Sequence, residues 1–405
     1  MSSVYRLFSK ESIINIAQEA EALSSYIAEK RRYFHRHAEL SFKETNTTDV
    51  LAKELAAIGY QVKLFPDYEG VLATLPNTED GRTVLLRSDI DALPVTEETG
   101  ADFASETPGV MHACGHDCHM AMLLGAAKLL AAHKDALPGT VKLLFQSAEE
   151  TGYGAKYYVE QGVLTGVNAA LGLHMSPYIP KGMLNIEKGP RMAACTNFRL
   201  VFHGEAAHGS TPHLGHDAIV AASASVMNIQ TAVSRLNNPL SPLVVTIGSV
   251  KAGKQFNIIC GTVTMEGTIR SFDRDVTAKA PEWVKDLAEG TAKTLGCSAE
   301  FTPVSFEPAV INETDALTDL AAGAAISLFG KDVLAHQKPV MASEDFSLIM
   351  EKVPSVFCYL GTKEAGMDAP LHSGHFLPDD SVLYKGAALH AQFALDYFAK
   401  GGASK

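Results

Sequence analysis

The amino-acid sequence predicts an α/β fold in which a mixed sheet, with helices on both faces, is interrupted by a ferredoxin-like α+β domain. Over residues 61–190 short apolar strands alternate with helices, which is typical of a parallel or mixed sheet. From about Cys195 the order changes to strand, helix, strand, strand, helix, strand. The 405 residues are also too many for one ordinary core. We therefore predict a larger domain formed by residues 1–190 and 305–405, with residues 191–304 inserted into it.

The first part of the larger domain begins with helices. Ile13, Ile16 and Ala20 recur at helical spacing, and residues 51–60 predict a further helix that ends at Gly59. Short β-rich runs then predict strands at 61–65, 70–75, 83–89, 141–146 and 169–174. Two helices lie between these strands, a buried one at 120–133 and another near 153–163.

The inserted domain has its own sequence pattern. Its strands are predicted at 198–202, 243–250, 262–270 and 299–304, and its helices at 216–236 and near 276–295. After this domain the alternation resumes with a strand at 355–360 and a final helix near 382–399. We find no internal repeat, low-complexity tract or long linker.

Charge and composition exclude several classes of protein. The chain carries 34 Lys and Arg against 46 Asp and Glu, a net charge of −12, which disfavours nucleic acid or an anionic membrane as its partner. No apolar run approaches the roughly 18 residues of a membrane-spanning helix, and the N-terminus lacks a signal-peptide core. Six cysteines in so long a chain do not form a disulfide framework. We therefore expect a soluble protein of the reducing cytoplasm.

The most informative segment is MHACGHDCHM (111–120), immediately before the buried helix. It packs three histidines, two cysteines and an aspartate into ten residues. Such residues could simply fill the start of a helix, but thiolate and imidazole are also the commonest ligands of zinc-class metals. Cys114 and His116 have Gly115 between them, so both can turn towards one site. We therefore favour a metal site here.

Further candidate ligands follow the ends of apolar strands. Glu149 and Glu150 end one strand and His174 ends another, while His372 and His375 lie in a later segment. Adjacent strand residues point to opposite sides, so one glutamate could bind metal and the other act as a general base. Open α/β sheets place their sites at the carboxyl ends of strands. The sequence therefore predicts one metal centre that gathers these segments.

Eight segments in this order resemble the aminoacylase, hippurate hydrolase and auxin-conjugate hydrolase branch of the dinuclear metallopeptidases of peptidase family M20. The resemblance runs from RRYFHRHAELSF (31–42) to the last helix, and HACGHD followed by EE is its specific part. The segments are RSDIDALP (87–94), MHACGHDCH (111–119), FQSAEE (145–150), GLH (172–174), GEAAHGSTPHLGHDAI (204–219), GTIR (267–270), SEDFS (343–347) and LHSGHF (371–376).

The resemblance implies a function for individual residues of this chain. It implies a general base at Glu149, and substrate-carboxylate or oxyanion contacts from His208, Asn257 and Arg270. In relatives the histidine often reaches across a dimer interface, so the inserted domain is expected to be a dimerisation and lid domain, and the protein a homodimer. Asp89 and Asp91 are expected only to support the ligands. The implied metal ligands are Cys114, His116, Glu150, His174 and His372.

The expected reaction is hydrolysis of the amide bond of an N-acyl amino acid, with two divalent ions per subunit providing an activated water. Zn²⁺ and Mn²⁺ suit the ligands, and Co²⁺ remains possible. The acyl group and the amino acid stay open, as does a metallo-dipeptidase or carboxypeptidase activity. Gly374 stands where relatives usually have proline, so His375 is a second candidate ligand. A metal-free cysteine hydrolase based on Cys114 and a non-catalytic metal- or amino-acid-binding protein are the weaker alternatives.

Overall fold

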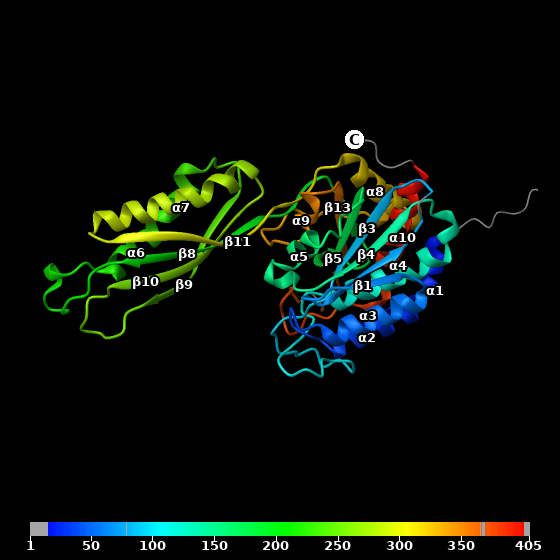
Figure 1. The fold of residues 1–405 in the computed structure, drawn as a ribbon, viewed down its shortest axis with the longest axis horizontal. Helices are drawn as coiled ribbons and strands as arrows, with labels where there is room; N and C mark the ends of the chain where they lie inside the picture. The colour runs from blue at the N-terminus through cyan, green and yellow to red at the C-terminus, as the bar shows by residue number, and fades with distance from the viewer. Residues whose placement is uncertain (1–14, 78, 365, 367–368, 401–405) are drawn as a thin grey trace, which may run out of the picture.

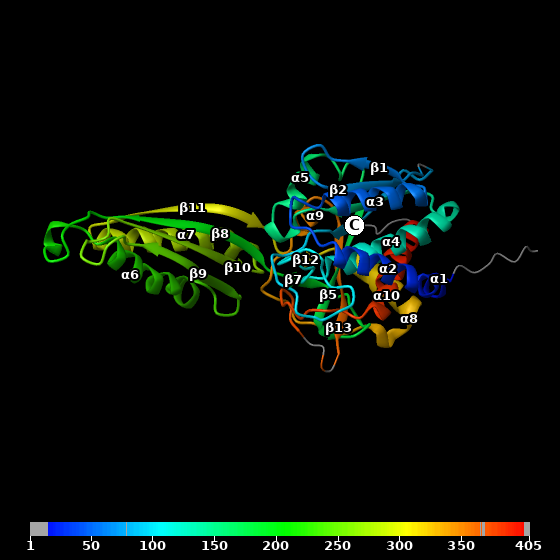
Figure 2. The ribbon, with the colours of Figure 1, turned by 90° about the horizontal axis from the view of Figure 1, so that it is seen from below.

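The computed structural model describes residues 15–77, 79–364, 366 and 369–400 and shows two lobes side by side (Figure 1). Ile13, at the start of the first predicted helix, lies outside the described residues. The small lobe is the segment Ala194–Glu307, and the rest of the chain forms the large lobe, from which the small one stands apart in both side views (Figures 1 and 2). Within the described ranges, none of the helices combines the length and apolar character needed to cross a bilayer.

The large lobe is built on a seven-stranded mixed sheet with strand order β1-β2-β4-β3-β5-β13-β6. The four strands β4, β3, β5 and β13 run parallel, and the remaining pairs are antiparallel. This agrees with the predicted mixed sheet. The strands are β1 (Gln61–Leu64), β2 (Gly70–Leu75), β3 (Thr83–Asp89), β4 (Thr140–Gln146), β5 (Ala169–Pro180), β6 (Leu184–Asn185) and β13 (Ser355–Lys363).

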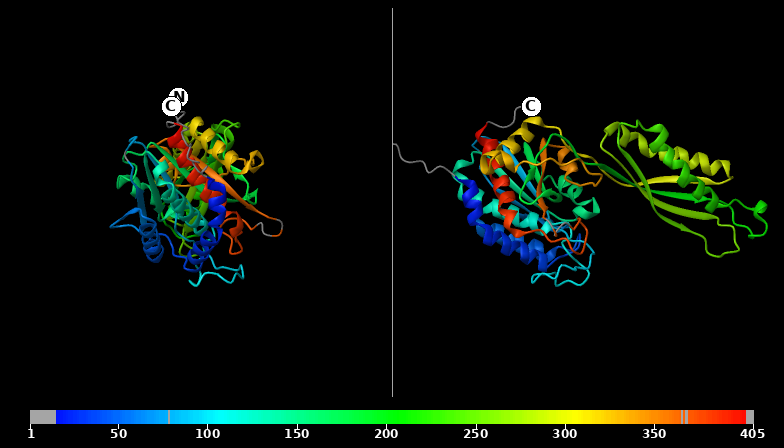
Figure 3. Two further views of the ribbon diagram at one scale, coloured as in Figure 1. Left: turned by 90° about the vertical axis from the view of Figure 1, so that its right-hand side faces the viewer. Right: turned by 180° about the vertical axis from the view of Figure 1, so that it is seen from behind.

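Both faces of this sheet are covered by helices, as the sequence predicts. Along β3, Val84 and Leu86 enter one hydrophobic core, whereas Leu85 enters a second core on the opposite face. The first face carries α1 (Ile16–Ala22), α2 (Ser24–Arg36), α3 (Thr45–Ile58), α4 (His116–Ala132), α8 (Asp315–Phe329) and α10 (Leu383–Ala399). The other carries α5 (Gly154–Glu160) and α9 (Ser347–Met350). Figure 3 shows α10 in red beside the blue N-terminal helices.

Helix α4 is the central helix of the larger core. Nearly every residue from His116 to Leu130 is buried, because the helix lies between the sheet and the helices α2 and α10. Its predicted start at 120 is too late by one turn. The polar residues of the first turn are buried with the apolar ones, so the hydrophobic pattern alone does not reveal where the helix begins.

The small lobe consists of an antiparallel sheet with strand order β11-β8-β10-β9 and two helices on one of its faces. Its elements are β8 (Ala194–His203), α6 (Ala218–Thr231), β9 (Leu243–Ala252), β10 (Thr262–Ser271), α7 (Arg274–Thr294) and β11 (Ser298–Glu307). Phe198, Leu200 and Phe202 alternate along β8 and pack under the helices. The residues that lie between these three along β8 point to the other face of the sheet, which among the described residues carries no helix of the small lobe and is called the open face below.

Candidate metal centre

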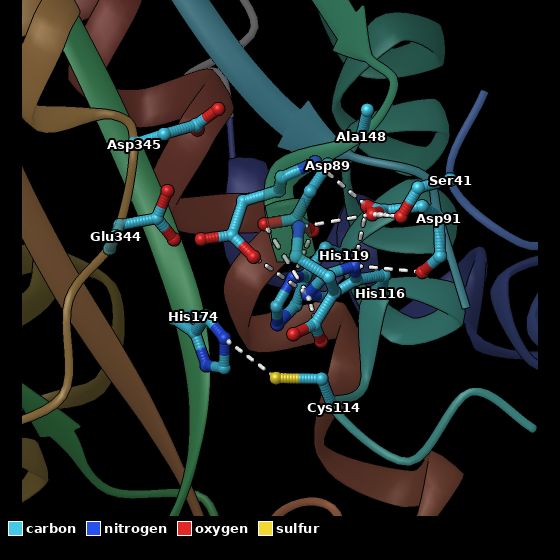
Figure 4. Close-up of polar contacts among 12 residues, drawn as sticks. Ser41, Asp89, Asp91, Cys114, His116, His119, Ala148, His174, Glu344 and Asp345 are labelled. Carbon is cyan, nitrogen blue, oxygen red and sulfur yellow. Dashed lines mark hydrogen bonds and ion pairs between the residues drawn. The ribbon is translucent and has the colours of Figure 1, made fainter. Parts of the chain in front are cut away.

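The carboxyl ends of parallel strands meet at one edge of the large sheet. β3 ends at Asp89 and β4 at Gln146, and these two residues are paired in register. β5 makes its last pair with β3 at Gly172 and carries His174 two residues later. β5 does not end at His174, as predicted, but continues along β13 to Pro180. Loops leave parallel strands on the same side, so side chains from the ends of β3, β5 and α4 and from the loops beside them converge here (Figure 4).

His116 opens helix α4 with one ring nitrogen free. Gly115 precedes it with a φ of +89°, which favours glycine and turns the chain into the helix just after Cys114. Nδ1–H of His116 donates to the backbone oxygen of Asp91 at 2.9 Å. This leaves Nε2 directed at the centre, where this buried atom has no hydrogen-bond partner among the described residues.

His119, one turn further along α4, has no free lone pair. Its Nε2 accepts the backbone N–H of Met175 at 2.9 Å, so Nδ1 carries the proton and donates to Asp89 Oδ1 at 2.6 Å. The other oxygen of Asp89 accepts from Arg87 at 2.8 Å. His119 therefore offers no ligand atom, and both oxygens of Asp89 already accept hydrogen bonds, so the two side chains support the site although they lie within reach of His116.

Glu149 and Glu150 do not lie on a strand, which corrects the prediction. β4 ends at Gln146, Ala148 takes a left-handed φ of +62°, and Glu149–Thr151 form one 3-10 turn. The alternation of strand residues therefore has no part in separating the two carboxylates. A carboxylate oxygen of each glutamate lies within 4.8 Å of the other and of His116, and Glu149 also approaches Glu344 and Asp345.

Asp91 holds this turn in place. Its Oδ1 accepts the backbone N–H of Glu149 at 3.2 Å, and its Oδ2 accepts that of Glu150 at 3.0 Å. The hydroxyl of Ser41 donates to Oδ2 at 2.7 Å, and His116 Nδ1 lies 3.3 Å from Oδ1. One buried carboxylate thus orients both glutamates and faces the ring of His116 (Figure 4).

The five predicted ligands fall into two groups that share Cys114. The ligand atoms within each group lie within 4.8 Å of one another: Cys114, His116 and His174 form the first, and Cys114, Glu150 and His372 the second. Cys114 Sγ is 3.5 Å from His174 Nε2, and Glu150 Oε2 is 3.5 Å from His372 Nε2. The structure therefore brings all five together in an arrangement with space for two neighbouring cations.

The two histidines of LHSGHF point to different places. His372 has a φ of +64°, its N–H donates to the backbone oxygen of Ala113 at 2.8 Å, and its ring faces the cluster. His375 instead places Nε2 3.0 Å from a carboxylate oxygen of Glu98 and donates from Nδ1 to the Glu98 backbone oxygen at 3.1 Å. It belongs to no ligand group of the described residues. The geometry favours His372 as the ligand.

A buried ion network behind the cluster escaped the sequence analysis. Arg87 Nη2 lies 2.7 Å from Asp345 Oδ1 and 3.0 Å from Glu344 Oε1, and Gln146 Nε2 donates to both oxygens of Asp345 at 2.8 Å. One carboxylate oxygen each of Glu344, Asp345 and Glu149 lie within 4.8 Å of one another. The available signal was Arg87 directly after the apolar run 84–86 of a buried strand, because a buried arginine requires carboxylate partners.

The concentration of carboxylates perturbs the titration of the cluster. Burial raises the pKa of Glu149 well above its ordinary range, and the neighbouring carboxylates raise it further. Burial also raises the pKa of Glu150 to about 7 and that of the Cys114 thiol well above its usual value. Burial disfavours charge on His116, yet Asp89 and other carboxylates raise its pKa to about 10. All four pKa shifts reduce the net negative charge of the cluster. Positive charge at the centre would therefore stabilise the ionised forms of the carboxylates and the thiol.

The donor set fits divalent cations. It combines one thiol, three imidazoles and a carboxylate, which are the ligand types of zinc-class metals. Two of the inward-facing atoms, His116 Nε2 and Glu150 Oε1, are buried without a hydrogen-bond partner among the described residues. Buried polar atoms are rarely left unpaired, so these two indicate coordination positions.

A cleft of about 580 Å³ opens onto the cluster. Cys114, Glu149, His174 and His372 form its floor, and Arg270 reaches it from the end of β10 in the small lobe. The Nη1 of Arg270 donates to the backbone oxygen of Met341 at 2.9 Å. Of the three substrate residues that the sequence predicts, Arg270 therefore lies at the site.

His208 and Asn257 lie together but away from this cleft. Both are exposed, and a backbone hydrogen bond of 2.8 Å joins the loops that carry them. The His208 loop leaves β8 after His203, whereas Arg270 pairs with Cys195 at the other end of β8. Eight residues of strand separate these ends by roughly 27 Å. The two residues therefore do not meet the metal centre of their own chain.

Comparison with known proteins gives concordant matches. Residues 85–396 match the model of peptidase family M20/M25/M40. The chain is 37% identical over 378 residues to N-acetyl-L-cysteine deacetylase of Bacillus subtilis, covering 92% of this chain and 89% of the relative. It is 36% identical over 397 residues to thermostable carboxypeptidase 1 of Saccharolobus solfataricus, covering 95% and 98%. The crystal structure of the B. subtilis YXEP protein, a dinuclear metal-binding peptidase from the M20 family, superposes with a TM-score of 0.81 at 34% identity, covering 93% of this chain and 98% of that one.

Proposed function

The chain belongs to peptidase family M20/M25/M40, and on that premise we propose that it is a metal-dependent amidohydrolase that cleaves the amide bond of N-acyl amino acids. The observation that carries the proposal is the pair of ligand groups sharing Cys114, with Glu149 beside them in a cleft that also holds Arg270. A relative named as an N-acetyl-L-cysteine deacetylase supports the substrate class.

Two divalent ions would be held by the two ligand groups. We assign His116 and His174 to one ion and Glu150 and His372 to the other, with Cys114 between them. When bound, the ions supply an acidified water and polarise the scissile carbonyl. We propose Zn²⁺ or Mn²⁺, with Co²⁺ as a further candidate, because the mixed S, N and O donors suit all three.

Glu149 is the proposed general base and acid. It lies in the cleft next to the ligand groups, with Oε2 3.9 Å from His116 Nε2, so it can receive a proton from the attacking water. Its carboxyl then returns that proton to the amine that leaves. Burial and nearby carboxylates raise the pKa of Glu149, which makes it a stronger base than an exposed glutamate. Of the neighbouring carboxylates that line the cleft, Glu150 is an assigned ligand and Glu344 pairs with Arg87 at 3.0 Å.

Arg270 is the proposed contact of the substrate carboxylate. Its guanidinium offers a planar fork that matches a carboxylate, and within the described part of the chain only Nη1 has a hydrogen-bond partner, the backbone oxygen of Met341. A carboxylate next to the scissile amide distinguishes an N-acyl amino acid from a simple amide. Arg270 would therefore select the substrate and fix the amide over Glu149.

We further propose that residues 191–304 form a ferredoxin-like dimerisation and lid domain between catalytic segments 1–190 and 305–405. The order of its strands and helices supports this, as do exposed apolar side chains on α6 and near the edge strand β9, such as Met227 at 71% and Phe256 at 96% exposure. In a homodimer, His208 and Asn257 would reach the metal centre of the partner. The six cysteines are all free and buried, which supports a cytoplasmic setting.

Subunit mixing tests the composite site. His208→Ala and Glu149→Gln protomers should each be nearly inactive alone. Exchange would create hybrid dimers in which one site keeps both residues, so activity should return. If activity does not return although subunit exchange is demonstrated, His208 does not act across the interface.

The function itself is tested by hydrolysis of a panel of N-acyl amino acids. Chelator dialysis should abolish activity, and Zn²⁺, Mn²⁺ or Co²⁺ should restore it. His372→Gln should lower the bound metal content, whereas His375→Gln, in the same loop but turned towards Glu98, should leave it unchanged. Full activity in protein that elemental analysis shows to be metal-free would contradict the proposal.

A carboxypeptidase activity is the second candidate, because one relative bears that name and Arg270 would equally bind a C-terminal carboxylate. Blocked dipeptides should therefore be included in the panel. Faster cleavage of these than of every N-acyl amino acid would favour the second candidate.

A further inference from the structure

Glu307 lies across the sheet of the small lobe from Arg270, and the two residues carry opposite charges. Cys195 on β8 pairs with Arg270 on β10 on one side and with Glu307 on β11 on the other. Residues paired in register point to the same face, so the three side chains share the open face of the sheet. Two strand spacings place the backbones of Arg270 and Glu307 roughly 10 Å apart. A guanidinium and a carboxyl therefore flank a small, buried cysteine.

Glu307 lies in the cleft of the metal centre. It lines that cleft together with Arg270, and its side chain rests against Gly152, just after the turn that carries Glu149. A Cβ on Gly152 would come within 2.1 Å of Glu307 Oε1, so the glycine makes room for this carboxyl. The mechanism described above does not use Glu307.

No cation of the described residues forms an ion pair with the carboxyl of Glu307. Burial raises its pKa, and the negative charge of Glu344 raises it further, whereas a hydrogen bond from Ser343 and the charge of Arg270 lower it. Among the described residues Arg270 is the one cation that acts in this way, and its guanidinium is directed to the backbone oxygen of Met341. Only 7% of Glu307 is exposed. A buried carboxylate without a cation is costly, so a cation brought by the substrate would relieve that cost.

We propose that Glu307 determines substrate specificity by binding the side-chain cation of the amino acid, so that the preferred substrates are N-acyl derivatives of basic amino acids such as lysine and ornithine. The inference rests on the proposed function, because Arg270 must hold the α-carboxylate of the same molecule. The flexible aliphatic chain of such an amino acid runs along residues 341–343, which line the cleft beside both Arg270 and Glu307, and joins the two charged groups. An acidic group at this position of the substrate would instead face Glu307 and be rejected.

The test compares N-acetyl-L-lysine with N-acetyl-L-norleucine, which has a similar aliphatic chain without the ammonium group. The metal-loaded wild-type enzyme should show a kcat/KM at least about tenfold higher for the lysine derivative, because one charge-assisted hydrogen bond has that effect or more. Glu307→Gln should remove the preference by slowing the lysine derivative while leaving the norleucine derivative within about twofold of wild type. Glu300→Gln, an exposed glutamate on the same strand, is the matched control and should retain the preference.

The outcomes separate the two proposals. Equal kcat/KM for both substrates in the wild-type enzyme, or a preference that survives Glu307→Gln, would overturn the assignment of Glu307 alone. Hydrolysis of no N-acyl amino acid by protein with bound metal would overturn the proposed function and this assignment with it. If Glu307→Gln fails to fold, inhibition of the wild-type enzyme by the two products decides instead: L-lysine should bind more tightly than L-norleucine, and equal inhibition would overturn the assignment.

Discussion

Asp91→Asn tests whether the Glu149–Glu150 turn is positioned by a carboxylate that makes no direct contact with substrate. The substitution keeps the shape of the side chain but replaces one of its oxygens by NH₂. The remaining oxygen can take over the position of Oδ2, which accepts from Glu150 N–H and from Ser41. The amide NH₂ then faces the N–H of Glu149, which Oδ1 accepts at 3.2 Å in the native protein. Two donors oppose each other at a buried position.

The size of the effect follows from these contacts. A buried N–H left without an acceptor costs about 1–3 kcal/mol, and the loss of the negative charge weakens the remaining bonds as well. We therefore expect the turn to be destabilised by about 2–4 kcal/mol. His116 should stay oriented, because its Nδ1–H donates to the backbone oxygen of Asp91, which the substitution leaves intact. The damage should fall on Glu149 and Glu150.

Steady-state kinetics and metal analysis provide the assay. kcat should fall by about 10- to 100-fold, as is typical for groups that orient a metal site, while the ion bound by His116 and His174 is retained. Ser41→Ala, which removes one donor to the same carboxylate, is the control and should have a much smaller effect. A kcat for Asp91→Asn within about twofold of wild type, in folded protein, would refute the positioning role.

Three further predictions concern the same lobe. Glu149→Gln should keep the metal content but lower kcat by about 10²- to 10⁴-fold, whereas Glu150→Gln should weaken metal binding; reversed phenotypes would exchange the two assignments. Arg87→Met leaves the buried carboxylates of Asp89, Glu344 and Asp345 without their cation, so the free energy of unfolding by urea should fall by about 3–5 kcal/mol, and an unchanged value would contradict the network. Burial alone would raise the pKa of Glu97, but hydrogen bonds from His35, the Ser105 N–H and Thr99 lower it to about 2. This carboxylate therefore stabilises the fold fully above its unfolded-state pKa of about 4.3 and loses that contribution as the pH falls towards 2, so Glu97→Gln should destabilise the protein at pH 7 and much less near pH 2.

The helices and strands were largely predictable because each has a sequence period that matches its environment. β3 contains the uninterrupted apolar run 84–86 because both of its faces are buried, and α7, with one face exposed, shows the helical period. The start of α4 was missed because its first turn buries His116, Asp117 and His119, and no hydrophobicity pattern marks a helix whose buried residues are polar.

The site was predictable as a set of ligands but not as a geometry. Cys114, His116 and His174 were identified from residue type and from resemblance, and the structure brings them together. Residue type alone could not show that His119 has no free lone pair, because that depends on the backbone N–H of Met175. Nor could it separate Glu149 from Glu150, since the turn that separates them requires a left-handed Ala148.

The small lobe begins and ends on adjacent strands, because Cys195 near the start of β8 pairs with Glu307 at the end of β11. Its two chain ends therefore lie about one strand spacing apart, roughly 5 Å. A short turn could close the gap if the segment were excised, and a foreign module with neighbouring termini could be grafted in its place. The large lobe, which positions the ligands, and the small lobe, which carries Arg270 and Glu307, can therefore be exchanged independently in protein engineering.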